Sequence, residues 1–397
     1  MGVFCAKIRN TMSHRLKVVI LVVDDRFSRT AIPPCFGSAP TALLEGFSRM
    51  SEELETHIVA CTPPMHAGNT TVMDCMTFHA IPMGKYGFIH SLHLVCRLSV
   101  GRLLKKLKPD LVHAMGTERW CAVSGAFRGY PTLLTMHGIL GRILPSSDLE
   151  SSAYWRLQEF LERMTIPGFD KVICNSRHTE SYVENLTPRT ELIPHGIRRL
   201  FLESPPLPRE DVTTPVILCV GTFYVLKRQL EILHLARNLH ARGAKAIFRF
   251  LGDLGTEDEY SRSCRQEIAH GEAAGYVQYG GKIGAEDVLR ELDTAHAMIH
   301  FSEEESFGLA VAEGLARGLK VFTNAAGGLR DVIDGVDGVI VEEDVSRLGQ
   351  LIECWLAAGA PRLPDAARIM QQRYSPDKIA ARHLELYRRL IRDKDQK

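Results

Sequence analysis

The sequence lacks a surplus of charge of either sign, and it lacks closely spaced cysteines. Its 397 residues carry 48 lysines and arginines against 47 aspartates and glutamates, a formal net charge of +1. A nearly neutral chain has no overall field that would attract nucleic acid or an anionic membrane, so any site for a polyanion must be local. The 10 cysteines never fall within ten positions of one another, which excludes a CxxC redox pair or a zinc ribbon built from neighbouring residues. We interpret them as reduced cytosolic thiols.

Long apolar runs are also missing. The longest run near the N-terminus covers 18–23 and is followed by Asp24 and Asp25. A run of this length is too short for the apolar core of a signal peptide or for a membrane span, so it predicts a buried strand in a cytoplasmic protein. Met12 is an alternative to Met1 as the true start of the chain.

Familiar motifs for nucleotides and metals are absent. The first predicted strand is followed by Val23-Asp24-Asp25-Arg26 instead of GxGxxG, and GxxxxGK[ST] occurs nowhere. These absences argue against a dinucleotide-dependent dehydrogenase and against a P-loop NTPase. The pattern DxD, which would hold a divalent metal on a diphosphate, occurs only at 393–395. We therefore expect neither a metal nor a cofactor.

The sequence does contain a globular composition and a regular alternation of strands and helices. Hydrophobic residues make up 45% of the chain and charged residues 24%, as in ordinary globular proteins. Short β-branched runs alternate with helical patterns, which indicates βα units and parallel sheets, an α/β fold class. Two sets of strands are predicted, near 17–23, 56–61, 110–114, 131–136, 171–174 and 191–193, and near 215–220, 246–251, 276–279, 296–301, 320–323 and 339–341.

A proline-rich polar stretch separates the two sets of strands and marks a domain boundary. We predict a first domain over 1–203, a linker over 204–215 and a second domain over 216–375. The last helical pattern, 376–397, should pack back on the first domain. In two such open sheets the carboxyl ends of the strands can face each other across a cleft, where we expect the ligand to bind.

The segment 301–318 is the most informative part of the chain. An apolar strand ends there and a helix is predicted to begin near Ser306, so free amides and the positive end of the helix dipole would point into the cleft, which suits a phosphate. Gly308 would let the backbone approach a ligand closely. We expect Glu303 and Glu304 to be solvated acidic residues of the first turn.

Glu305 and Glu313 lie eight positions apart. If both are helical, their directions around the axis differ by about 80° and their heights by about 12 Å. One carboxylate then lies at the mouth of the cleft and the other further down. Because carboxylates accept hydrogen bonds from paired hydroxyls, this spacing suits a ligand with a sugar at one end and a ribose at the other. The neighbours of Glu313 are mostly small or apolar, so we do not expect an exposed side chain there.

This pattern resembles the retaining glycosyltransferases of family 4, which have the GT-B fold of two facing Rossmann-like domains. The E-x7-E element of the family matches at Glu305 and Glu313, and the similarity continues in the same order through 317–321 and 326–338. The resemblance implies that Glu305 contacts the transferred sugar and that Glu313 binds the ribose hydroxyls.

The resemblance also implies roles for the residues around this element. The amides of Phe307, Gly308 and Leu309, which lie inside the E-x7-E element, would help to hold the donor. The base would be met by the backbone of 280–283, so Ile283 is a candidate for the base-binding segment.

A second family element, the strand and turn that grip the donor pyrophosphate, resembles residues 220–223 followed by Lys227. It implies that Gly221 and Thr222 approach the donor and that Lys227 stabilises the leaving diphosphate as a point charge. Many family members have an arginine where this sequence has Thr222. Arg228 is our candidate for the second cation, and a plain surface arginine is the alternative.

The first domain contains three histidines of interest. His137 closes a predicted strand and resembles the family histidine on the acceptor side of the cleft. His113 ends the preceding strand, and both a supporting role and a core position stay open for it. His195 stands in a stretch that resembles the Pro-Asn-Gly-Val of the family, with histidine in place of asparagine, and we interpret it as part of a structural turn.

Loops of the first domain complete the expected site. The loop 33–40 resembles the glycine-containing loop before the first helix, and the amides of Gly37 and Ser38 could approach the donor phosphate or the acceptor. The loops 84–90 and 138–149 are expected to contact the acceptor.

A basic helical stretch covers 103–108, with Arg97 and Arg102 before it. Two interpretations stay open: the solvated face of a helix, or a surface that rests on anionic lipid at the inner face of a membrane.

The resemblance implies a metal-independent retaining glycosyltransferase that moves a sugar from a nucleotide-diphosphate donor to an acceptor hydroxyl. Retention implies attack on the same face as the departing phosphate, whose oxygen takes the acceptor proton while His137 orders sugar and acceptor. We expect a glycan or lipid-linked acceptor of cell-surface polysaccharide, lipopolysaccharide or glycolipid synthesis, and no nucleic acid. A non-catalytic nucleotide-sugar-binding protein and a GT-B-fold epimerase or phosphorylase stay open as alternatives, as does the oligomeric state.

Overall fold

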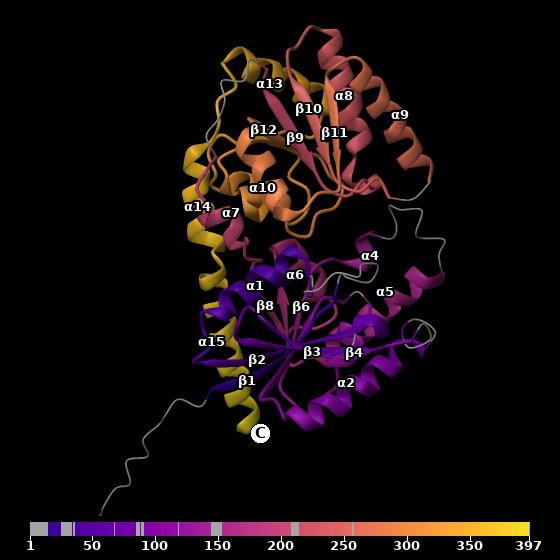
Figure 1. Cartoon of the computed structure of the whole chain (residues 1–397), viewed down its shortest axis with the longest axis vertical. Helices are drawn as coiled ribbons and strands as arrows, with labels where there is room; N and C mark the ends of the chain where they lie inside the picture. Colours follow the sequence, from indigo (N-terminus) through magenta and orange to yellow (C-terminus); the bar gives the residue numbers. More distant parts are fainter. Residues whose placement is uncertain are drawn as a thin grey trace, which may run out of the picture.

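A computed structural model describes residues 15–24, 34, 36–66, 68–84, 88, 91–117, 119–143, 153–207, 214–255 and 258–396. It has two α/β units, with the N-terminal unit in the lower half of Figure 1 and the C-terminal unit in the upper half. Both candidate start residues, Met1 and Met12, lie outside the described residues, as do Cys35, most of the loop 84–90, residues 144–149 and linker residues 208–213.

The N-terminal unit is built on an eight-stranded sheet with the order β3-β4-β2-β1-β5-β6-β7-β8. Neighbouring strands are parallel, and the edge strand β3 is antiparallel to β4. The strands are β1 Leu16–Leu21, β2 Leu54–Thr62, β3 Gly68–Val72, β4 Met76–Pro82, β5 Leu111–Met115, β6 Thr132–Thr135, β7 Lys171–Cys174 and β8 Thr190–Leu192.

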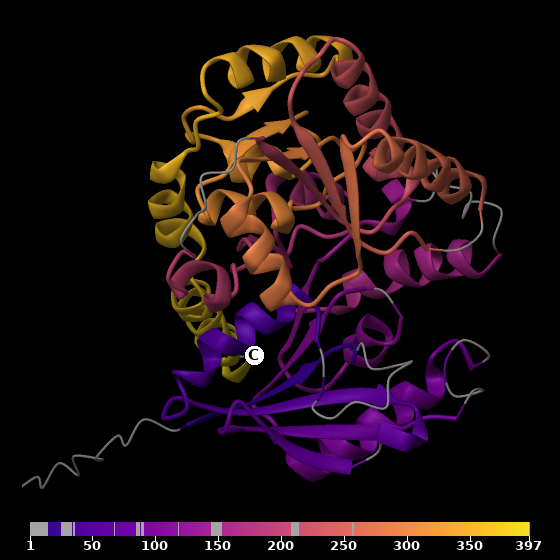
Figure 2. The same ribbon diagram turned by 45° about the horizontal axis from the view of Figure 1, so that its top comes forward.

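The C-terminal unit has a six-stranded sheet with the order β11-β10-β9-β12-β13-β14, all parallel. Its strands are β9 Val216–Val220, β10 Ile247–Leu251, β11 Val277–Gly281, β12 Ala297–His300, β13 Lys320–Thr323 and β14 Ile340–Val341. In the turned view of Figure 2 this sheet again stands above the N-terminal sheet and carries helices around it.

The helices complete the two layers around each sheet. They are α1 Ser38–Ser48, α2 Leu94–Leu107, α3 Cys121–Gly125, α4 Leu140–Ile143, α5 Ala153–Thr165, α6 Arg177–Val183, α7 Arg199–Glu203, α8 Gln229–Ala241, α9 Glu259–Ala273, α10 Ala285–Thr294, α11 Leu309–Ala316, α12 Leu329–Ile333, α13 Val345–Ala357, α14 Pro364–Tyr374 and α15 Pro376–Asp395. Short 3-10 turns cover Pro64–His66, Ile166–Gly168 and Val225–Lys227.

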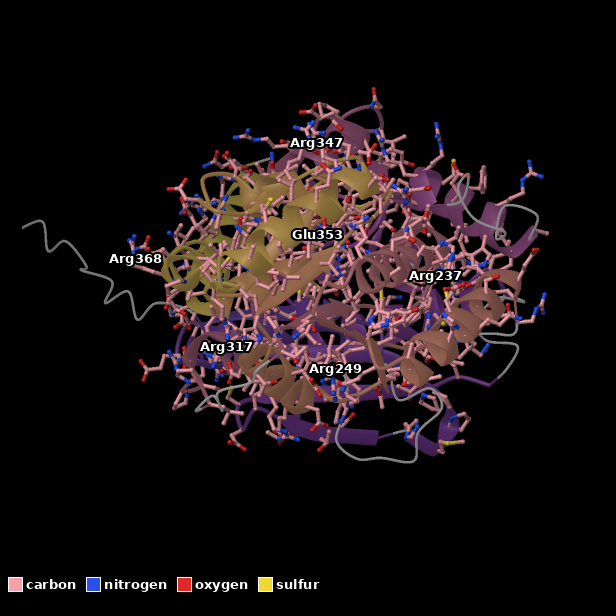
Figure 3. The ribbon with its side chains drawn as sticks, turned by 90° about the horizontal axis from the view of Figure 1, so that it is seen from above. Arg237, Arg249, Arg317, Arg347, Glu353 and Arg368 are labelled. Carbon is pink, nitrogen blue, oxygen red and sulfur yellow. The ribbon has the colours of Figure 1, made fainter. Side chains whose placement is uncertain are left out.

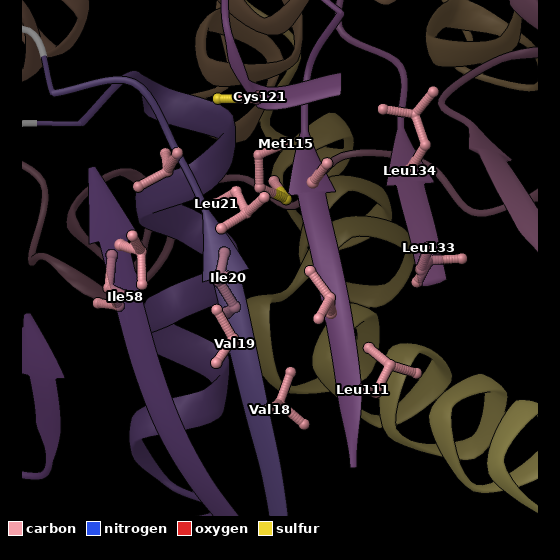
Figure 4. Close-up of a cluster of buried hydrophobic side chains, with 14 of the residues drawn as sticks. Val18, Val19, Ile20, Leu21, Ile58, Leu111, Met115, Cys121, Leu133 and Leu134 are labelled. Atoms are coloured by element: carbon pink, nitrogen blue, oxygen red, sulfur yellow. The ribbon is translucent and has the colours of Figure 1, made fainter. Parts of the chain in front are cut away.

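The apolar run near the N-terminus forms the central strand β1. Val18, Val19, Ile20 and Leu21 are all buried, as expected for a strand with helices on both faces of its sheet. Figure 4 shows these side chains between those of the neighbouring strands β2 and β5. The run is therefore a core strand, as its length predicted.

The predicted α/β class with parallel sheets is confirmed, and all twelve predicted strands are present to within a few residues. The prediction missed β3 and β4. The sequence of β3 is Gly-Asn-Thr-Thr-Val, and most of it is exposed at the edge of the sheet. Because an exposed edge strand needs no apolar face, its sequence carries little periodic signal.

The C-terminal helix α15 returns to the N-terminal unit. Its residues Ile379, Ala380, Leu384 and Tyr387 belong to the hydrophobic cluster that contains β1, β2 and β5. The helix is the yellow rod along the left of the N-terminal unit in Figure 1. The end of the chain thus stabilises the core in which the chain begins.

A buried ion pair fixes the start of the linker to the C-terminal unit. Arg317, marked in Figure 3, forms a bidentate contact with Asp293 at 2.7 and 3.0 Å. Its remaining guanidinium nitrogen donates to the carbonyls of Phe201 and Ser204, at 3.2 and 2.8 Å. The start of the linker is therefore tied to the ends of α10 and α11 in the C-terminal unit.

Candidate active site

Two loops at the carboxyl ends of neighbouring strands bring a cation and a carboxylate together. Lys227 lies in the 3-10 turn after β9, and Glu305 lies in the loop after β12. Lys227 Nζ donates to Glu305 Oε2 at 2.5 Å. Because β9 and β12 are adjacent in the sheet, their carboxyl-terminal loops meet at one place, where ligands bind in open α/β sheets.

Glu305 has a second partner that the sequence analysis missed. His300, the last residue of β12, lies with Nε2 3.0 Å from Glu305 Oε2, and Ser302 Oγ lies 2.8 Å from the same nitrogen. Burial raises the pKa of Glu305, but the charge of Lys227 and the hydrogen bond of His300 outweigh burial and hold this pKa well below its usual range. Glu305 is thus held as a carboxylate.

The environment of Glu313 shifts its pKa upward, in the opposite direction to that of Glu305. Glu313 occupies α11, its side chain is 7% exposed, and its Oε1 has no hydrogen-bond partner among the described residues. Burial raises its pKa to about 8, against a smaller opposing effect of the charge of Arg198. A buried carboxyl oxygen without a donor is costly, which makes Glu313 a candidate for ligand contact.

The helical arrangement expected for the two glutamates is wrong. Helix α11 begins at Leu309 and not near Ser306, so Glu305 lies in the preceding loop. Gly308 has a left-handed φ of 92°, which a continuous helix cannot contain. The buried Phe307 stands before this glycine, and only Glu313 of the pair is helical.

Histidines of the N-terminal unit form a ring stack that reaches the C-terminal unit. His137, two residues after β6, is half-buried and stacks on the buried His195 with ring centroids 5.0 Å apart. His195 in turn meets the ring of Phe307 edge-on at 5.4 Å. Asn175, after β7, donates to His195 Nε2 at 3.0 Å. The stretch interpreted as a turn therefore connects His137 to the E-x7-E loop.

His113 is a core residue. Its two ring nitrogens contact Tyr387 Oη of α15 and Thr135 Oγ1, each at 2.7 Å. Complete burial, with the nearby His383 adding to it, lowers the pKa of His113 well below its usual value. Of the two positions left open for it, the structure thus selects the core.

The N-terminal end of α6 docks on the loop after β12. Ser176 Oγ donates to the carbonyl of Ser306 at 2.6 Å, and His178 Nε2 lies 2.6 Å from Glu304 Oε1. The expectation of a solvated Glu304 is wrong because its side chain is used in this contact between the units, whereas Glu303 is exposed as expected. The main-chain amide of Arg177 also donates to Asp331 at 2.6 Å.

Three other residues of the predicted donor site lie before and after Lys227 in the chain. Arg228, beside Lys227, pairs with Glu231 at 2.9 Å and lies over the ring of Phe301 at 4.6 Å. Thr222 is exposed in the turn after β9. Gly221 is approached so closely by Gly252 that a Cβ on Gly252 would lie 1.9 Å from the Gly221 carbonyl oxygen.

The remaining predicted residues lie at loop and helix ends. Gly37 precedes α1, and Ser38 is the exposed first residue of this helix. In Figure 1 helix α1 lies on the side of the N-terminal unit that faces the C-terminal unit. Ile283 lies between β11 and α10, half-buried against the core of the C-terminal unit. Leu309 is the first residue of α11.

A cavity of about 760 Å³ opens where the two units meet, lined by Arg177, His178, Gly327, Arg330, Asp331, Ile333 and Asp334. Its lining includes neither Lys227 nor Glu305. It therefore lies beside the ion pair, on the side of the His178 contact.

The described residues bring together no three side chains of His, Cys, Asp or Glu in a way that could hold a metal ion. Among the helices that the structure describes, none combines the length and the apolar composition needed to cross a bilayer.

Two family models match the chain. The family described as "Glycosyl transferases group 1" matches residues 203–372, and "Glycosyltransferase Family 4" matches residues 43–199. A D-inositol 3-phosphate glycosyltransferase of Xylanimonas cellulosilytica is 39% identical over 90 residues, which are 22% of this chain and 22% of that relative.

Solved structures resemble almost the whole length of the chain. A sucrose-phosphate synthase from Thermosynechococcus elongatus superposes with a TM-score of 0.76 at 18% identity, over 96% of this chain and 100% of that one. Anabaena Alr3699/HepE in complex with UDP-glucose gives a TM-score of 0.67 at 16% identity, over 94% and 99%. These likenesses confirm the predicted GT-B fold.

Proposed function

Because the chain belongs to the group 1 and family 4 glycosyltransferases, we propose that it moves a sugar from a nucleotide-diphosphate donor to an acceptor hydroxyl with retention of configuration. The observation that carries this proposal is the contact of Lys227 with Glu305 at the carboxyl ends of β9 and β12. A bound diphosphate can replace Glu305 as the partner of Lys227, and a sugar hydroxyl can replace Lys227 as the partner of Glu305.

Lys227 is the group that would stabilise the leaving diphosphate. Its side chain is 30% exposed, so a phosphate oxygen can reach it without a change of fold. When the diphosphate accepts from Lys227, Glu305 keeps its bond to His300 and becomes free to accept from a sugar hydroxyl. The charge that develops on the phosphate is then met by a fixed cation, which lowers the barrier to departure.

Glu313 is the group that would bind the ribose. A pair of ribose hydroxyls supplies the hydrogen-bond donors that its Oε1 lacks among the described residues. Donation to the carboxylate favours the charged form of Glu313, so binding of the donor would lower the pKa that burial has raised to about 8.

The proposed route needs no nucleophilic side chain and no metal. The acceptor hydroxyl attacks the sugar from the face that the phosphate leaves, and the departing phosphate oxygen takes the hydroxyl proton. His137, held by its stack with His195, would orient the acceptor next to the sugar. UDP sugars are the first donors to test, because the solved structure of Anabaena Alr3699/HepE is a complex with UDP-glucose.

The experiment is a thermal-shift panel of UDP, GDP and ADP sugars, followed by a measurement of nucleotide diphosphate release. A donor at 100 times its dissociation constant adds about 2.7 kcal/mol of stability, which is readily measured as a rise in Tm. Release of nucleotide diphosphate, accelerated by the acceptor, is the expected result. A shift without release would favour a nucleotide-sugar-binding protein, for which the exposed Thr222 in place of the family arginine leaves room.

Variants of Lys227 and Glu313 test the roles proposed for these two residues in binding the donor. Lys227→Ala and Glu313→Ala should each cost roughly 2 to 4 kcal/mol in kcat/KM for the donor, since each removes a charge-assisted contact. Glu303→Gln is the matched control because Glu303 is an exposed glutamate of the same loop as Glu305. Wild-type turnover by both alanine variants would contradict the proposal.

A further inference from the structure

Helix α2 leaves an unusual set of side chains in solvent. Leu94, Val95 and Leu98 are all exposed, Leu98 by 62%, although large apolar side chains are usually buried in a helix that packs on a sheet. Arg102, Lys105 and Lys106 continue the same exposed side toward the C-terminal end of the helix. The helix contains no acidic residue.

Helix α5 repeats this combination. Phe160 and Met164 are exposed by 57% and 55%. The exposed charged residues of this helix are Arg156, which precedes Phe160, and Arg163, which lies between Phe160 and Met164. The acidic residues of this helix are withdrawn: Glu162 is buried and accepts from Thr117 Oγ1 at 2.6 Å, and Glu159 is half-buried. Each helix therefore offers solvent large apolar groups together with charge of one sign.

The two exposed helix sides belong to one region of the N-terminal unit. His93, the residue before α2, contacts Gln158 in the middle of α5 at 3.1 Å. The short helix α3 contacts both α2 and α5. Figure 1 shows α2 and α5 along the lower right of the N-terminal unit, away from α15. We call these side chains, from Leu94 to Lys106 on α2 and from Arg156 to Met164 on α5, the apolar-basic face.

We propose that the apolar-basic face docks the protein on the surface of an anionic lipid bilayer, with the exposed apolar side chains inserted at the headgroup boundary and the lysines and arginines on the lipid phosphates. An amphipathic surface with large apolar side chains and only basic exposed charges is what such an interface binds. The chain as a whole has a net charge of only +1, so this one-sided charge is a local property of the face. A nucleic acid would use the basic residues but would leave Leu98, Phe160 and Met164 without apolar partners.

The apolar-basic face lies near the part of the N-terminal unit where the acceptor is expected to bind. The carboxyl of Glu162, on the inner side of α5, lies 3.5 Å from the amide of Leu140, three residues after His137. The bilayer would thus lie next to the acceptor side of the cleft, within reach of a lipid-linked acceptor. This consequence rests on the proposed function, whereas the docking itself does not.

The experiment is flotation of the full chain with vesicles of phosphatidylcholine alone and with vesicles that contain phosphatidylglycerol. Binding is expected on the anionic vesicles, and it should weaken steeply as salt is raised. Lys105→Glu combined with Lys106→Glu should reduce binding by at least tenfold, because each basic residue contributes about 1 kcal/mol at an anionic surface. Leu98→Ser and Phe160→Ser should each also reduce it several-fold, since each removes an inserted apolar side chain.

Matched controls lie on the C-terminal unit. Lys245→Glu combined with Arg368→Glu makes the same change of charge, and Arg368 projects from α14 at the periphery in Figure 3. Val341→Ser removes an apolar side chain that is 47% exposed. Both controls should bind vesicles as the unchanged protein does.

Several results would overturn the proposal. Equal binding to vesicles with and without phosphatidylglycerol, or full binding by the Lys105/Lys106 double variant, would contradict an anionic bilayer as the partner. Absence of binding by the folded protein would contradict docking on lipid altogether. A dimer in solution that Leu98→Ser dissociates would show that a second copy covers the face. Release of nucleotide diphosphate by the same variants in detergent should be unchanged, so a failure of docking and a failure of the transferase assignment give different results.

Discussion

The two glutamates of the E-x7-E element have opposite environments although they lie eight positions apart. Glu305 has Lys227 and His300 as partners, and its pKa is lowered. Glu313 is buried with one oxygen unpartnered among the described residues, and its pKa is raised to about 8. At neutral pH the first is a carboxylate and the second is mostly protonated, so the two residues are prepared for different contacts.

Glu313 should make the stability of the ligand-free protein fall with rising pH. Its pKa is about 8 in the folded protein and near 4.5 in the unfolded chain, so between these values the folded protein keeps a proton that the unfolded chain has released. The free energy of unfolding therefore decreases as the pH rises through this window. Glu313→Gln, which cannot ionise, should gain Tm over the wild type as the pH is raised from 5 to 8. Parallel Tm curves for the two proteins would contradict a raised pKa.

His300 should act as a positioning residue for Glu305. His300→Phe removes one of the two contacts that keep the buried carboxyl ionised, so the pKa of Glu305 should rise. Loss of a hydrogen bond to a charged group costs about 1.5 to 3 kcal/mol, which corresponds to roughly one to two pH units. We expect the acidic limb of the pH profile of kcat/KM for the donor to move to higher pH by that amount.

Ser302→Ala is the control for this shift. It removes the other partner of His300 and leaves the contact with Glu305 in place, so its acidic limb should move less. His300→Gln, which can still donate to Glu305, should restore part of the wild-type profile. If all three profiles coincide with the wild type, His300 has no positioning role.

At the scale of elements, the loop after β12 is fixed from three sides. Asn324, after β13, exchanges two hydrogen bonds with the backbone of Ser302, at 3.0 and 2.6 Å. The start of α6 contacts the same loop through Ser176. The amide of Gly328, before α12, donates to the Glu305 carbonyl at 2.7 Å. The position of Glu305 thus depends on both units.

Gly328→Ala should disturb this loop. A Cβ on Gly328 would lie 2.0 Å from the carbonyl oxygen of Ser306 and 2.5 Å from Ser176 Oγ, and neither neighbour can move freely. Overpacking of this kind costs about 1 to 3 kcal/mol. We expect a lower free energy of unfolding and a lower kcat/KM for the donor. Gly129→Ala, where a Cβ meets nothing within 4 Å, should leave both quantities near the wild type.

For the whole molecule, α15 connects the two units. It follows α14 of the C-terminal unit directly and packs against α1 in the core of the N-terminal unit. Close approach is allowed by Gly46 of α1, because a Cβ there would lie 2.5 Å from Ala380 Cβ and 2.4 Å from the Pro376 carbonyl oxygen. The close packing of α15 against the first helix therefore depends on this one small residue.

Gly46→Ala should destabilise the protein although alanine usually favours a helix by about 0.5 to 1 kcal/mol. The clash with α15 costs about 1 to 3 kcal/mol and exceeds that gain. Gly101→Ala in α2 is the comparison, since its Cβ would meet the end of the flexible Arg128 side chain. Denaturant unfolding should give Gly46→Ala a clearly lower midpoint than Gly101→Ala. The opposite order would show that α15 can move away from α1 without cost.

The α/β class, twelve of the strands and the spacing of the two glutamates follow from the amino-acid sequence. These features are local: a strand is visible in consecutive apolar residues, and the E-x7-E element lies within one stretch of chain. The missed strand β3 shows the limit of this reasoning, because an exposed edge strand needs no apolar pattern.

Which residues from other parts of the chain surround the glutamates follows from the tertiary structure alone. Glu304 meets His178 across the units, and His195 joins His137 to Phe307. The same holds for the apolar-basic face, whose apolar residues look from the sequence like those of any packed helix. Contacts between distant segments depend on how the sheets, loops and C-terminal helix assemble, and the local pattern of residues contains no measure of that assembly.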